Sequence, residues 1–516
     1  MKPKPKRDNS LEHYLKLLAK SSIIVFIGLF LSKVMAYAYR IIIARYFGAE
    51  IYGLFSLALI LITLFTSFAS FGLIDGLIRF ISFYRGKNQN DKIRYLFRYA
   101  IIFLAISSIL SGLLLFALSQ FISVRIFHDA RLIIFLRFFS ILVPLTLISN
   151  ALLSVIKGYE KIGWYSFIAN IIQNVTKLLV LALFIFLGFG VSAVIFSQIL
   201  AVFSVLLAAY FVCRCLIVVI FQKSHINKRS KVQLKKDLFS YSWPIIFASI
   251  LSSIFYWADS LSIGYFKTAF DVGLYNAAVP LLYLFNLIQE AFSQLFLPLV
   301  TKEFSKNNKS LVKELSKQVT KWVFIFSVPL FLILFVFPEQ IIVLFFGQEF
   351  VLASSVLRIL SIGGFLSFIV PVATSLILMA GKSKLLLTNL IFATGLNLFL
   401  NIMLIPMYGL NGAAIATSVS WTVMSLMLLI EAKKFTSIVP LKRKMLRVLL
   451  VSILPLILLL IIKYNLPLTN FSFILICIFF FLVYALLVLI SGCLDRNDFA
   501  VVSSIKRKIQ EAYSKA

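Results

Sequence analysis

Fourteen apolar stretches, each about 20 residues long, occupy most of this sequence. A helix of that length crosses a hydrocarbon layer roughly 30 Å thick. Inside lipid, only helices or closed barrels satisfy all of their backbone hydrogen bonds. The sequence therefore predicts an all-α polytopic membrane protein with fourteen transmembrane helices. We place them at residues 21–44, 52–81, 99–120, 132–156, 164–187, 191–220, 239–264, 273–300, 321–338, 352–379, 384–405, 410–431, 447–462 and 471–492.

The basic residues predict the orientation of these helices. The formal net charge is +31, yet charged residues make up only 13% of the chain and hydrophobic residues 61%. The N-terminal residues and every second loop hold 38 of the 50 Lys and Arg residues. Because basic loops stay in the cytoplasm, we expect both termini on the cytoplasmic side of a plasma or inner membrane. The positive charge is then a topology signal that meets anionic lipid headgroups, and it does not indicate nucleic-acid binding.

Part of the sequence occurs twice. RYFGAEIYGLFSLA at 45–58 returns as YFKTAFDVGLYNAA at 265–278, at a fixed offset of 220. Because each copy contains six helices, an even number, both copies enter the membrane from the same side as a parallel repeat. We expect an N-lobe at 1–222, a basic cytoplasmic linker at 223–237 and a C-lobe at 238–432. Residues 433–516 add a basic loop, two helices without a counterpart in the repeat and a cytosolic tail.

Several kinds of chemistry have no support in the sequence. There is no G-x-x-x-x-G-K-[ST] phosphate loop. The three histidines lie outside the apolar stretches, and the four cysteines lie within or beside them. No connection on the outer side is long enough to hold an enzymatic domain. We therefore expect a protein that is not an enzyme and that has no metal site and no cofactor.

Charged and amide side chains inside the helices are the candidates for a binding site. A charge at the centre of a spanning helix costs about 2.5–3.5 kcal/mol, so it usually faces protein or water. Lys33 and Arg40 are seven residues apart and share one face of a helix. The candidates for lining a cleft are Lys33, Arg40, Lys177, Asn174, Asp259, Gln289 and Glu290.

In such a cleft the basic side chains would hold an anionic headgroup such as a pyrophosphate. Asp259 and Glu290 would pair with them or bind a coupling cation, either a proton or sodium. The alternative is that these charges form structural ion pairs or snorkel from the helix ends.

Weaker candidates lie near the ends of helices or follow from the repeat. Asp75 and Arg79 are spaced i, i+4 and could form a local salt bridge. Arg137 lies close to the end of its helix, and Asn397 matches Asn174 at an offset of 223. A Gly-x-x-x-Gly pattern beginning at Gly72 would allow a close contact between helices.

The stretch from Lys20 to Ala58 resembles the start of polysaccharide-biosynthesis membrane proteins of the multidrug/oligosaccharidyl-lipid/polysaccharide exporter superfamily. Their run A-R-x-[LF]-G-x-x-x-[YF]-G-L occurs here between Ala44 and Leu54, and their second-lobe run W-x-D-x-x-x-x-G begins at Trp257. By this resemblance the repeated run looks like the hairpin turn at the entrance to each lobe. Its residues Arg45, Gly48, Gly53 and Gly273 are then structural.

The resemblance implies a flippase that moves a lipid-linked oligosaccharide from the cytoplasmic to the outer leaflet by alternating access. The pyrophosphate and glycan would travel in the cationic cleft while the polyprenyl tail stays in lipid, and glycan-assembly enzymes are possible partners. Related lipid II flippases use their two extra helices as a groove for the tail. They also place an arginine in the eighth helix, where this chain has Gln289 and Glu290. That difference disfavours a peptidoglycan precursor as the substrate.

Two alternatives stay open at this point: a lipid II flippase and an ion-coupled multidrug antiporter of the same superfamily. The antiporter would normally stop at twelve helices and would carry acidic residues in its N-lobe. The sequence does not specify the sugar, the lipid carrier, the coupling ion or the oligomeric state.

Overall fold

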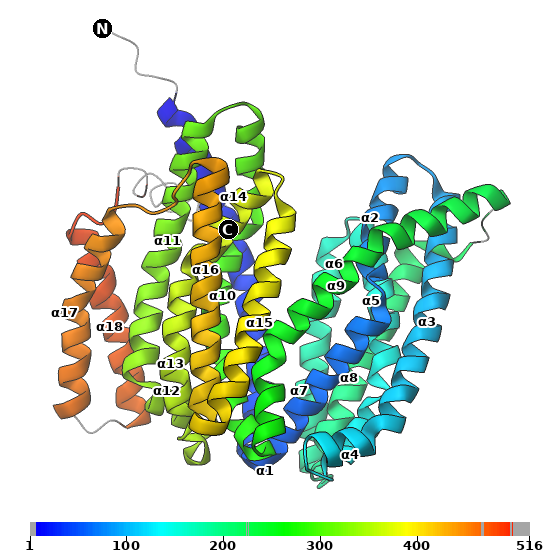
Figure 1. Cartoon of the computed structure of the whole chain (residues 1–516), viewed down its shortest axis with the longest axis horizontal. Coiled ribbons are helices and arrows are strands. Elements are labelled where there is room, and N and C mark those ends of the chain that lie inside the picture. The colour runs from blue at the N-terminus through cyan, green and yellow to red at the C-terminus, as the bar shows by residue number, and fades with distance from the viewer. Residues whose placement is uncertain (1–6, 223, 225, 466–468, 496–497, 499–516) are drawn as a thin grey trace, which may run out of the picture. The chain divides into compact units, whose positions relative to one another are not determined.

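The computed structural model describes residues 7–222, 224, 226–465, 469–495 and 498, with side chains inside α1 described from Phe30 onward. The predicted cytosolic tails lie partly outside this range, at residues 1–6 and 499–516. All regular structure of the described residues is helical (Figure 1). The α-helices are α1 (Arg7–Ser70), α2 (Leu73–Gly86), α3 (Asn90–Phe121), α4 (Leu132–Phe139), α5 (Leu142–Gly158), α6 (Ile162–Ser166), α7 (Gln173–Phe186), α8 (Ser192–Leu216), α9 (Lys228–Phe266), α10 (Ala269–Ser305), α11 (Lys309–Val336), α12 (Pro338–Phe346), α13 (Ala353–Leu366), α14 (Val370–Met379), α15 (Ser383–Tyr408), α16 (Leu410–Thr436), α17 (Lys444–Asn465) and α18 (Asn470–Ile490).

The predicted number of transmembrane helices is close to what the described residues contain. They include 13 helices that are long and apolar enough to cross a membrane, of which the first, Phe30–Ser70, has 41 residues. That helix contains Gly48, whose backbone is not helical, at φ 82° and ψ 174°. A positive φ combined with a ψ near 180° is a backbone conformation that essentially only glycine adopts, so the chain turns here and α1 contains two spans. The predicted fourteen and the observed thirteen differ because of this turn.

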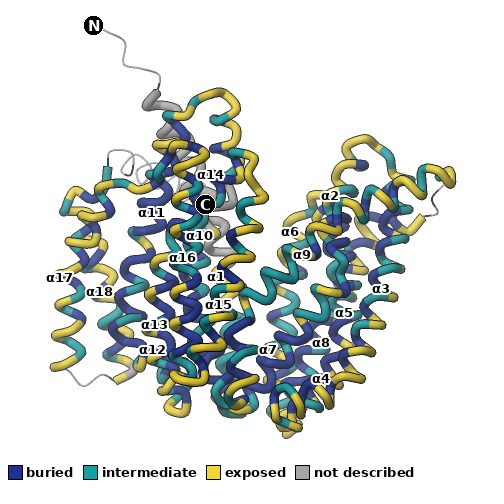
Figure 2. The backbone as a smooth tube through the Cα atoms, in the orientation of Figure 1, coloured by how far each residue is buried: buried dark blue, intermediate teal, exposed yellow. Residues whose placement is uncertain are grey.

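The chain divides into two compact units. Unit 1 comprises Met1–Leu31 and Ala277–Ala516, and unit 2 comprises Ser32–Asn276. Unit 2 therefore holds most of α1, all of α2 to α9, and the first two turns of α10. In each unit the buried residues follow the inward faces of the helices (Figure 2).

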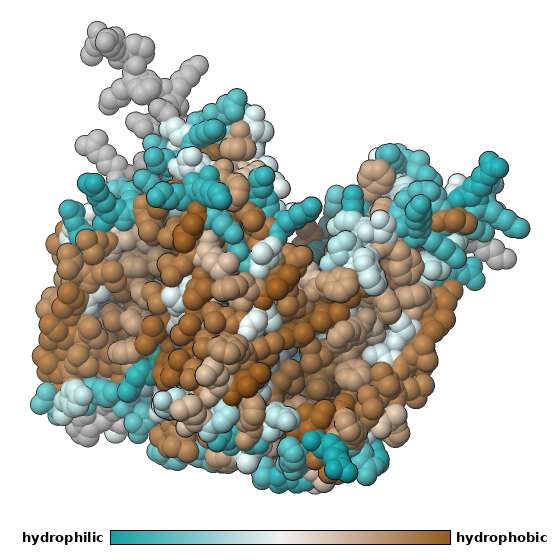
Figure 3. Space-filling view, in the orientation of Figure 1, coloured by the Kyte–Doolittle hydropathy of each residue, from teal (hydrophilic) through white to brown (hydrophobic). Residues whose placement is uncertain are grey.

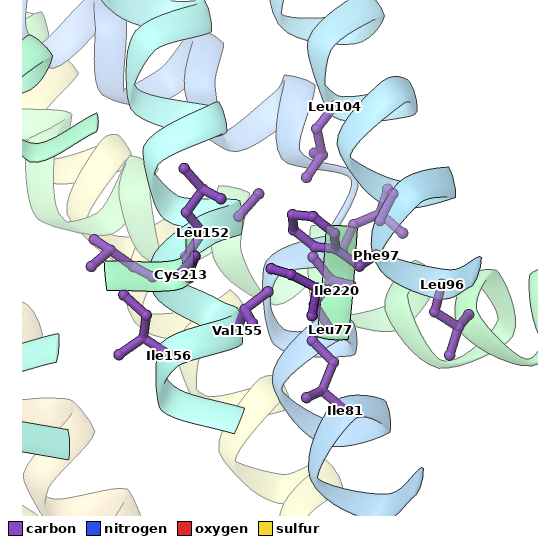
Figure 4. Close-up of a cluster of buried hydrophobic side chains, with 14 of the residues drawn as sticks. Leu77, Ile81, Leu96, Phe97, Leu104, Leu152, Val155, Ile156, Cys213 and Ile220 are labelled. Carbon is purple, nitrogen blue, oxygen red and sulfur yellow. Dashed lines mark hydrogen bonds between the residues drawn. The ribbon is translucent and has the colours of Figure 1, made fainter. Parts of the chain in front are cut away.

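The core of unit 2 is built from buried apolar side chains of several helices, among them α2, α3, α5 and α8. Leu77 of α2, Phe97 of α3, Leu152 of α5 and Cys213 of α8 meet in one cluster, shown in Figure 4. Leu77 and Cys213 are fully buried. The four helices α2, α3, α5 and α8 therefore pack together as one bundle.

The Gly-x-x-x-Gly pattern of Gly72 and Gly76 lies at a close contact between helices α2 and α9. A Cβ atom at Gly72 would lie 2.5 Å from the carbonyl oxygen of Ser242 in α9, and one at Gly76 would lie 2.5 Å from the hydroxyl oxygen of the same serine. Only glycine permits this approach of α2 to α9, as in other membrane helix pairs with small residues at their interface.

In unit 1, α11, α14 and α16 enclose a second core that includes Val323, Leu376 and Leu428. The outer surfaces of both units are apolar. Large side chains such as Leu110 of α3 and Leu482 of α18 are more than half exposed. In each unit the middle of the visible surface is hydrophobic and the hydrophilic residues gather towards the ends (Figure 3). A surface of this kind suits lipid, which confirms a multi-pass membrane protein.

Candidate functional site

Two of the three basic candidates, Arg40 and Lys177, lie close to Tyr39 in unit 2. The Lys177 ammonium group of α7 lies 5.6 Å from the centre of the Tyr39 ring in α1. Next to Tyr39 in sequence, the Arg40 guanidinium donates a hydrogen bond of 3.3 Å to the Tyr52 hydroxyl. Lys177 thus lies beside the residue that immediately precedes Arg40 in α1. The Arg40 and Lys177 side chains are both half-buried inside candidate membrane spans.

Asn174 explains why α7 presents Lys177 to α1. Its amide nitrogen donates to the Asn170 carbonyl at 2.7 Å and to the Ser32 carbonyl at 3.3 Å. The stretch Phe167–Ile172 just before α7 is a π-helix, which changes the direction of the following side chains and often occurs at functional sites. Asn174 and Lys177 are therefore brought to α1 as a pair. Lys33, beside Ser32, lies on an exposed part of α1.

Tyr39 joins this site to a third helix. It is buried, and its hydroxyl lies 2.9 Å from the hydroxyl of Ser197 in α8. Sequence reasoning did not propose Tyr39 or Ser197 as site residues. The repeat contained a signal for Tyr39, because an offset of 220 pairs it with Asp259.

Asp259 also lies in unit 2, in a buried setting. Its carboxylate accepts a hydrogen bond of 2.5 Å from the Tyr275 hydroxyl of α10. Phe55, the counterpart of Tyr275 at the offset of 220, contacts Tyr39 edge-on with ring centres 6.0 Å apart. Equivalent positions of the repeat thus make an aromatic contact in one copy and a hydrogen bond to a carboxyl group in the other.

A series of hydrogen bonds connects the two copies of the repeat. The Tyr52 hydroxyl that accepts from Arg40 donates to the Asn276 carbonyl at 3.0 Å. The Asn276 amide nitrogen donates to the Ser260 hydroxyl at 3.0 Å. Ser260 is the counterpart of Arg40 at the offset of 220, so hydrogen bonds join equivalent positions of the repeat.

The repeated hairpins touch through their backbones. A Cβ atom at Gly53 would lie 1.8 Å from the carbonyl oxygen of Ala269, and one at Gly273 would lie 1.9 Å from that of Ala49. Ala49 and Ala269 are counterparts, as are Gly53 and Gly273, so the contact is symmetric. Gly53 and Gly273 allow this close backbone contact, and Arg45 is exposed.

The remaining strong candidates lie in unit 1. Gln289 is buried, and its amide nitrogen donates to the Ser367 hydroxyl at 3.2 Å. Glu290 is exposed. The buried Asn397 of α15 donates to the Thr417 hydroxyl of α16 at 3.0 Å. These residues stay predictions for the binding site.

The weaker candidates of unit 2 have local contacts. Asp75 and Arg79, both of which the structure describes, form no ion pair with each other. The Arg79 guanidinium instead lies 4.0 Å from the centre of the Tyr241 ring, because α9 packs beside α2 and offers a nearer aromatic face. Arg137 lies near the Phe116 ring of α3, at 5.6 Å.

Unit 1 contains an apolar groove between its last two helices. Eight side chains of α17 and α18 line it: Pro455, Leu458, Leu459, Ile462, Ile476, Phe479, Phe480 and Val483. Such a lining can accept hydrocarbon and offers nothing to a sugar. Within the described part of the chain, no three His, Cys, Asp or Glu side chains gather as a metal ion would require.

The Asp259 hydrogen bond leads to a stability prediction. Hydrogen bonds to a charged group contribute about 1.5–3 kcal/mol, against about 0.5–1.5 kcal/mol for neutral pairs. We expect Tyr275→Phe to lower the free energy of unfolding in detergent micelles by the larger amount. Tyr39→Phe, which removes a bond between two neutral hydroxyls, should cost the smaller amount. Equal losses in the two variants would contradict a charged Asp259.

Two family models match the sequence. The model of the family described as polysaccharide biosynthesis protein matches residues 18–302, and the MatE model matches residues 244–403.

The curated relatives are similar to this chain at low identity. One is the "Probable low-salt glycan biosynthesis flippase Agl15" of Haloferax volcanii, 29% identical over 38% of this chain and 42% of its own length. The matched part is thus less than half of that relative. Another is the "Putative O-antigen transporter" of Shigella flexneri, 24% identical over 73% of this chain and 88% of its own length.

The fold is similar to that of a solved structure, lipid II flippase MurJ in an inward closed conformation. The TM-score is 0.68 at 17% sequence identity, over 90% of this chain and 98% of the other.

Proposed function

This chain belongs to the polysaccharide biosynthesis protein family, and from that membership we propose a flippase that carries a lipid-linked glycan across the membrane. It moves its substrate and leaves its covalent bonds unchanged. The names of the Haloferax and Shigella relatives support a glycan as the cargo. The likeness to the MurJ structure supports the fold that this transport requires.

The observation that carries the proposal is the pair of like charges on Arg40 and Lys177. Each charge inside a membrane span costs about 2.5–3.5 kcal/mol, and two cations near each other add repulsion. A pyrophosphate or phosphate group would offer acceptor oxygens and opposite charge to both of these cations. Asn174 and Tyr39 keep the two cations in place for it.

The remaining parts of the substrate follow from the same reasoning. The groove between α17 and α18 receives the polyprenyl tail, since its lining is entirely apolar. The basic loops lie in the cytoplasm of the plasma or inner membrane, so the substrate enters from that side. The turn at Gly48 and its counterpart at Thr268, between α9 and α10, then face the outer side of the membrane. Asp259 is the carboxylate that would take up a coupling proton or sodium ion.

The MatE match to residues 244–403 favours a second candidate function, an ion-coupled antiporter of organic cations. Such a protein needs acidic side chains where its cargo binds. The positive charges of Arg40 and Lys177 repel cations, and we therefore rank this function below the flippase.

Reconstitution into liposomes tests the proposal. We expect the wild-type protein to bring a fluorescent polyprenyl-pyrophosphate sugar from the inner leaflet to the outer one, where a membrane-impermeant reductant quenches it. Empty liposomes control for spontaneous movement. Ion-driven release of organic cations without movement of the lipid probe would support the antiporter. Movement of lipid II in preference to the oligosaccharide would identify a peptidoglycan precursor as the substrate.

A further inference from the structure

A buried ion cluster lies near the middle of α11, outside the proposed binding site. Lys321 has no exposed side-chain surface, and its ammonium group is bonded to the carboxylate of Asp498, of which only 4% is exposed. The same carboxylate accepts a hydrogen bond of 2.7 Å from the indole nitrogen of Trp322. The Gln318 amide donates to it as well. A buried charge is tolerated only when it is paired and hydrogen-bonded, and here both partners are.

The cluster extends through Asp495 to the start of α17. Lys321 lies 3.0 Å from one Asp495 oxygen, and Lys442 and Lys444 are bonded to the same carboxylate. The Lys442 ammonium also donates to the Gln318 carbonyl oxygen of α11 at 2.9 Å. Asp495 comes five residues after the end of α18, and Lys444 is the first residue of α17. One cluster thus joins α11 to one end of both added helices.

The added helices have few other specific contacts with their neighbours. The Tyr484 hydroxyl of α18 donates to the Ile325 carbonyl at 2.8 Å. At the opposite end of α17, the Lys463 ammonium donates to the Val336 carbonyl at 2.7 Å. The sequence of α18 contains no charged residue. Lipid chains are as apolar as these side chains, so hydrophobic burial alone does not drive α17 and α18 against α11.

From this arrangement we propose that Lys321, Asp495 and Asp498 form an electrostatic clasp that positions α17 and α18 so that their groove can hold the tail of the substrate. The tail assignment rests on the proposed function; the clasp itself does not. An apolar replacement could match a buried ion pair in stability, but it would not select one register for α18, whose sequence contains no charged residue. Paired charges do select one register, because a shift of one helix along the other would leave the charges unpaired in a low-dielectric setting. These three are positioning residues, since they act through the groove.

The ionisation of Asp495 agrees with a permanent clasp. Burial alone would raise its pKa, but hydrogen bonds from Lys442, Lys444 and Lys321 outweigh burial and hold the pKa well below its ordinary value. A carboxylate whose pKa is lowered by folding stabilises the protein at pH values above its ordinary pKa and loses that effect only as the pH falls below it. Asp495 therefore stays charged at neutral pH.

Asp498→Asn tests the clasp, because it removes the charge opposite Lys321 and keeps the shape. We expect faster amide hydrogen exchange in α17 and α18, with α15 and α16 unchanged. In liposomes, movement of a long-chain polyprenyl-pyrophosphate sugar should fall about tenfold relative to wild type. A short-chain analogue with the same headgroup should move at the wild-type rate, since its tail does not reach along the groove.

Controls separate the clasp from general damage. Glu160→Gln removes an exposed ion pair with Arg85 and should change neither exchange nor transport. If Asp498→Asn does not fold, Asp495→Asn serves instead, because that carboxylate is 19% exposed, against 4% for Asp498. Unchanged exchange in α17 and α18 would overturn the clasp. Equal losses for the long-chain and short-chain probes would overturn its role in holding the tail. If wild type moves neither probe, the proposed function fails, and the exchange measurement still decides whether the clasp exists.

Discussion

Arg40→Ala is expected to lower the rate of movement of a polyprenyl-pyrophosphate sugar at least about tenfold, the change that ~1.4 kcal/mol produces. The guanidinium is held by the Tyr52 hydroxyl at 3.3 Å and would contribute a charge-assisted bond to the phosphate. Lys177→Ala should have an effect of the same size, because both cations would face the same anion. The measurement is the quenching assay in liposomes, at equal amounts of folded protein.

A control variant distinguishes binding from the general loss of a basic residue. Arg214 lies in the last turn of α8, and its guanidinium is 5.9 Å from the centre of the Phe221 ring. Arg214→Ala should leave the rate near that of wild type. Arg40→Lys should recover part of the rate, since it restores the charge but not the paired donors. Full transport in both Arg40→Ala and Lys177→Ala would remove the cationic site from the mechanism.

Gly53→Ala is expected to destabilise the protein strongly. Its new Cβ atom would lie 1.8 Å from the Ala269 carbonyl oxygen, a backbone atom that no change of side-chain rotamer can relieve. The hairpins of α1 and α10 would have to separate, and overpacking of this kind costs about 1–3 kcal/mol or more. The thermal midpoint of the protein in detergent micelles measures the loss. Gly273→Ala should act in the same way, since it meets the Ala49 carbonyl oxygen at 1.9 Å.

Gly395 provides a matched control. It also lies inside a helix, α15, and a Cβ atom there would meet no heavy atom within 4 Å. Alanine is favoured over glycine in a helix interior by roughly 0.5–1 kcal/mol, so Gly395→Ala should leave the midpoint unchanged or raise it. Similar midpoints for Gly53→Ala and Gly395→Ala would mean that the two hairpins are not in backbone contact.

Much of the fold could be predicted because lipid imposes simple rules on a sequence. Helix length and the absence of charge marked the spans, and the one difference in their number arose at Gly48, where a single residue turns the chain. The repeat at an offset of 220 indicated that Gly53 and Gly273 are equivalent. It did not indicate that they touch, because matching positions in a repeat do not show how far apart two residues lie in space.

The candidate site was predicted in part. Arg40, Lys177 and Asn174 were found because charge and amide groups are costly inside a membrane span, and the structure brings them together in unit 2. Tyr39 and Tyr275 were missed, because aromatic residues are common in such helices and only their hydroxyl contacts distinguish them. The Lys321 cluster was missed for another reason. Lys321 and the two aspartates are 174 and 177 residues apart in sequence, and each resembles an ordinary loop charge when read alone.

The sequence by itself determined the class of protein, the membrane spans, the repeat and the charged or amide residues that are costly to place inside a membrane. It could do so because hydropathy and spacing are properties of local segments. The tertiary structure alone decided which of those residues are neighbours. Rotation of each helix about its axis depends on packing with other helices, and hydropathy does not specify that rotation. Packing turned Lys177 toward Tyr39, set Gly53 against Ala269, and brought Asp498 to a lysine that would otherwise be an unpaired charge buried beside the membrane.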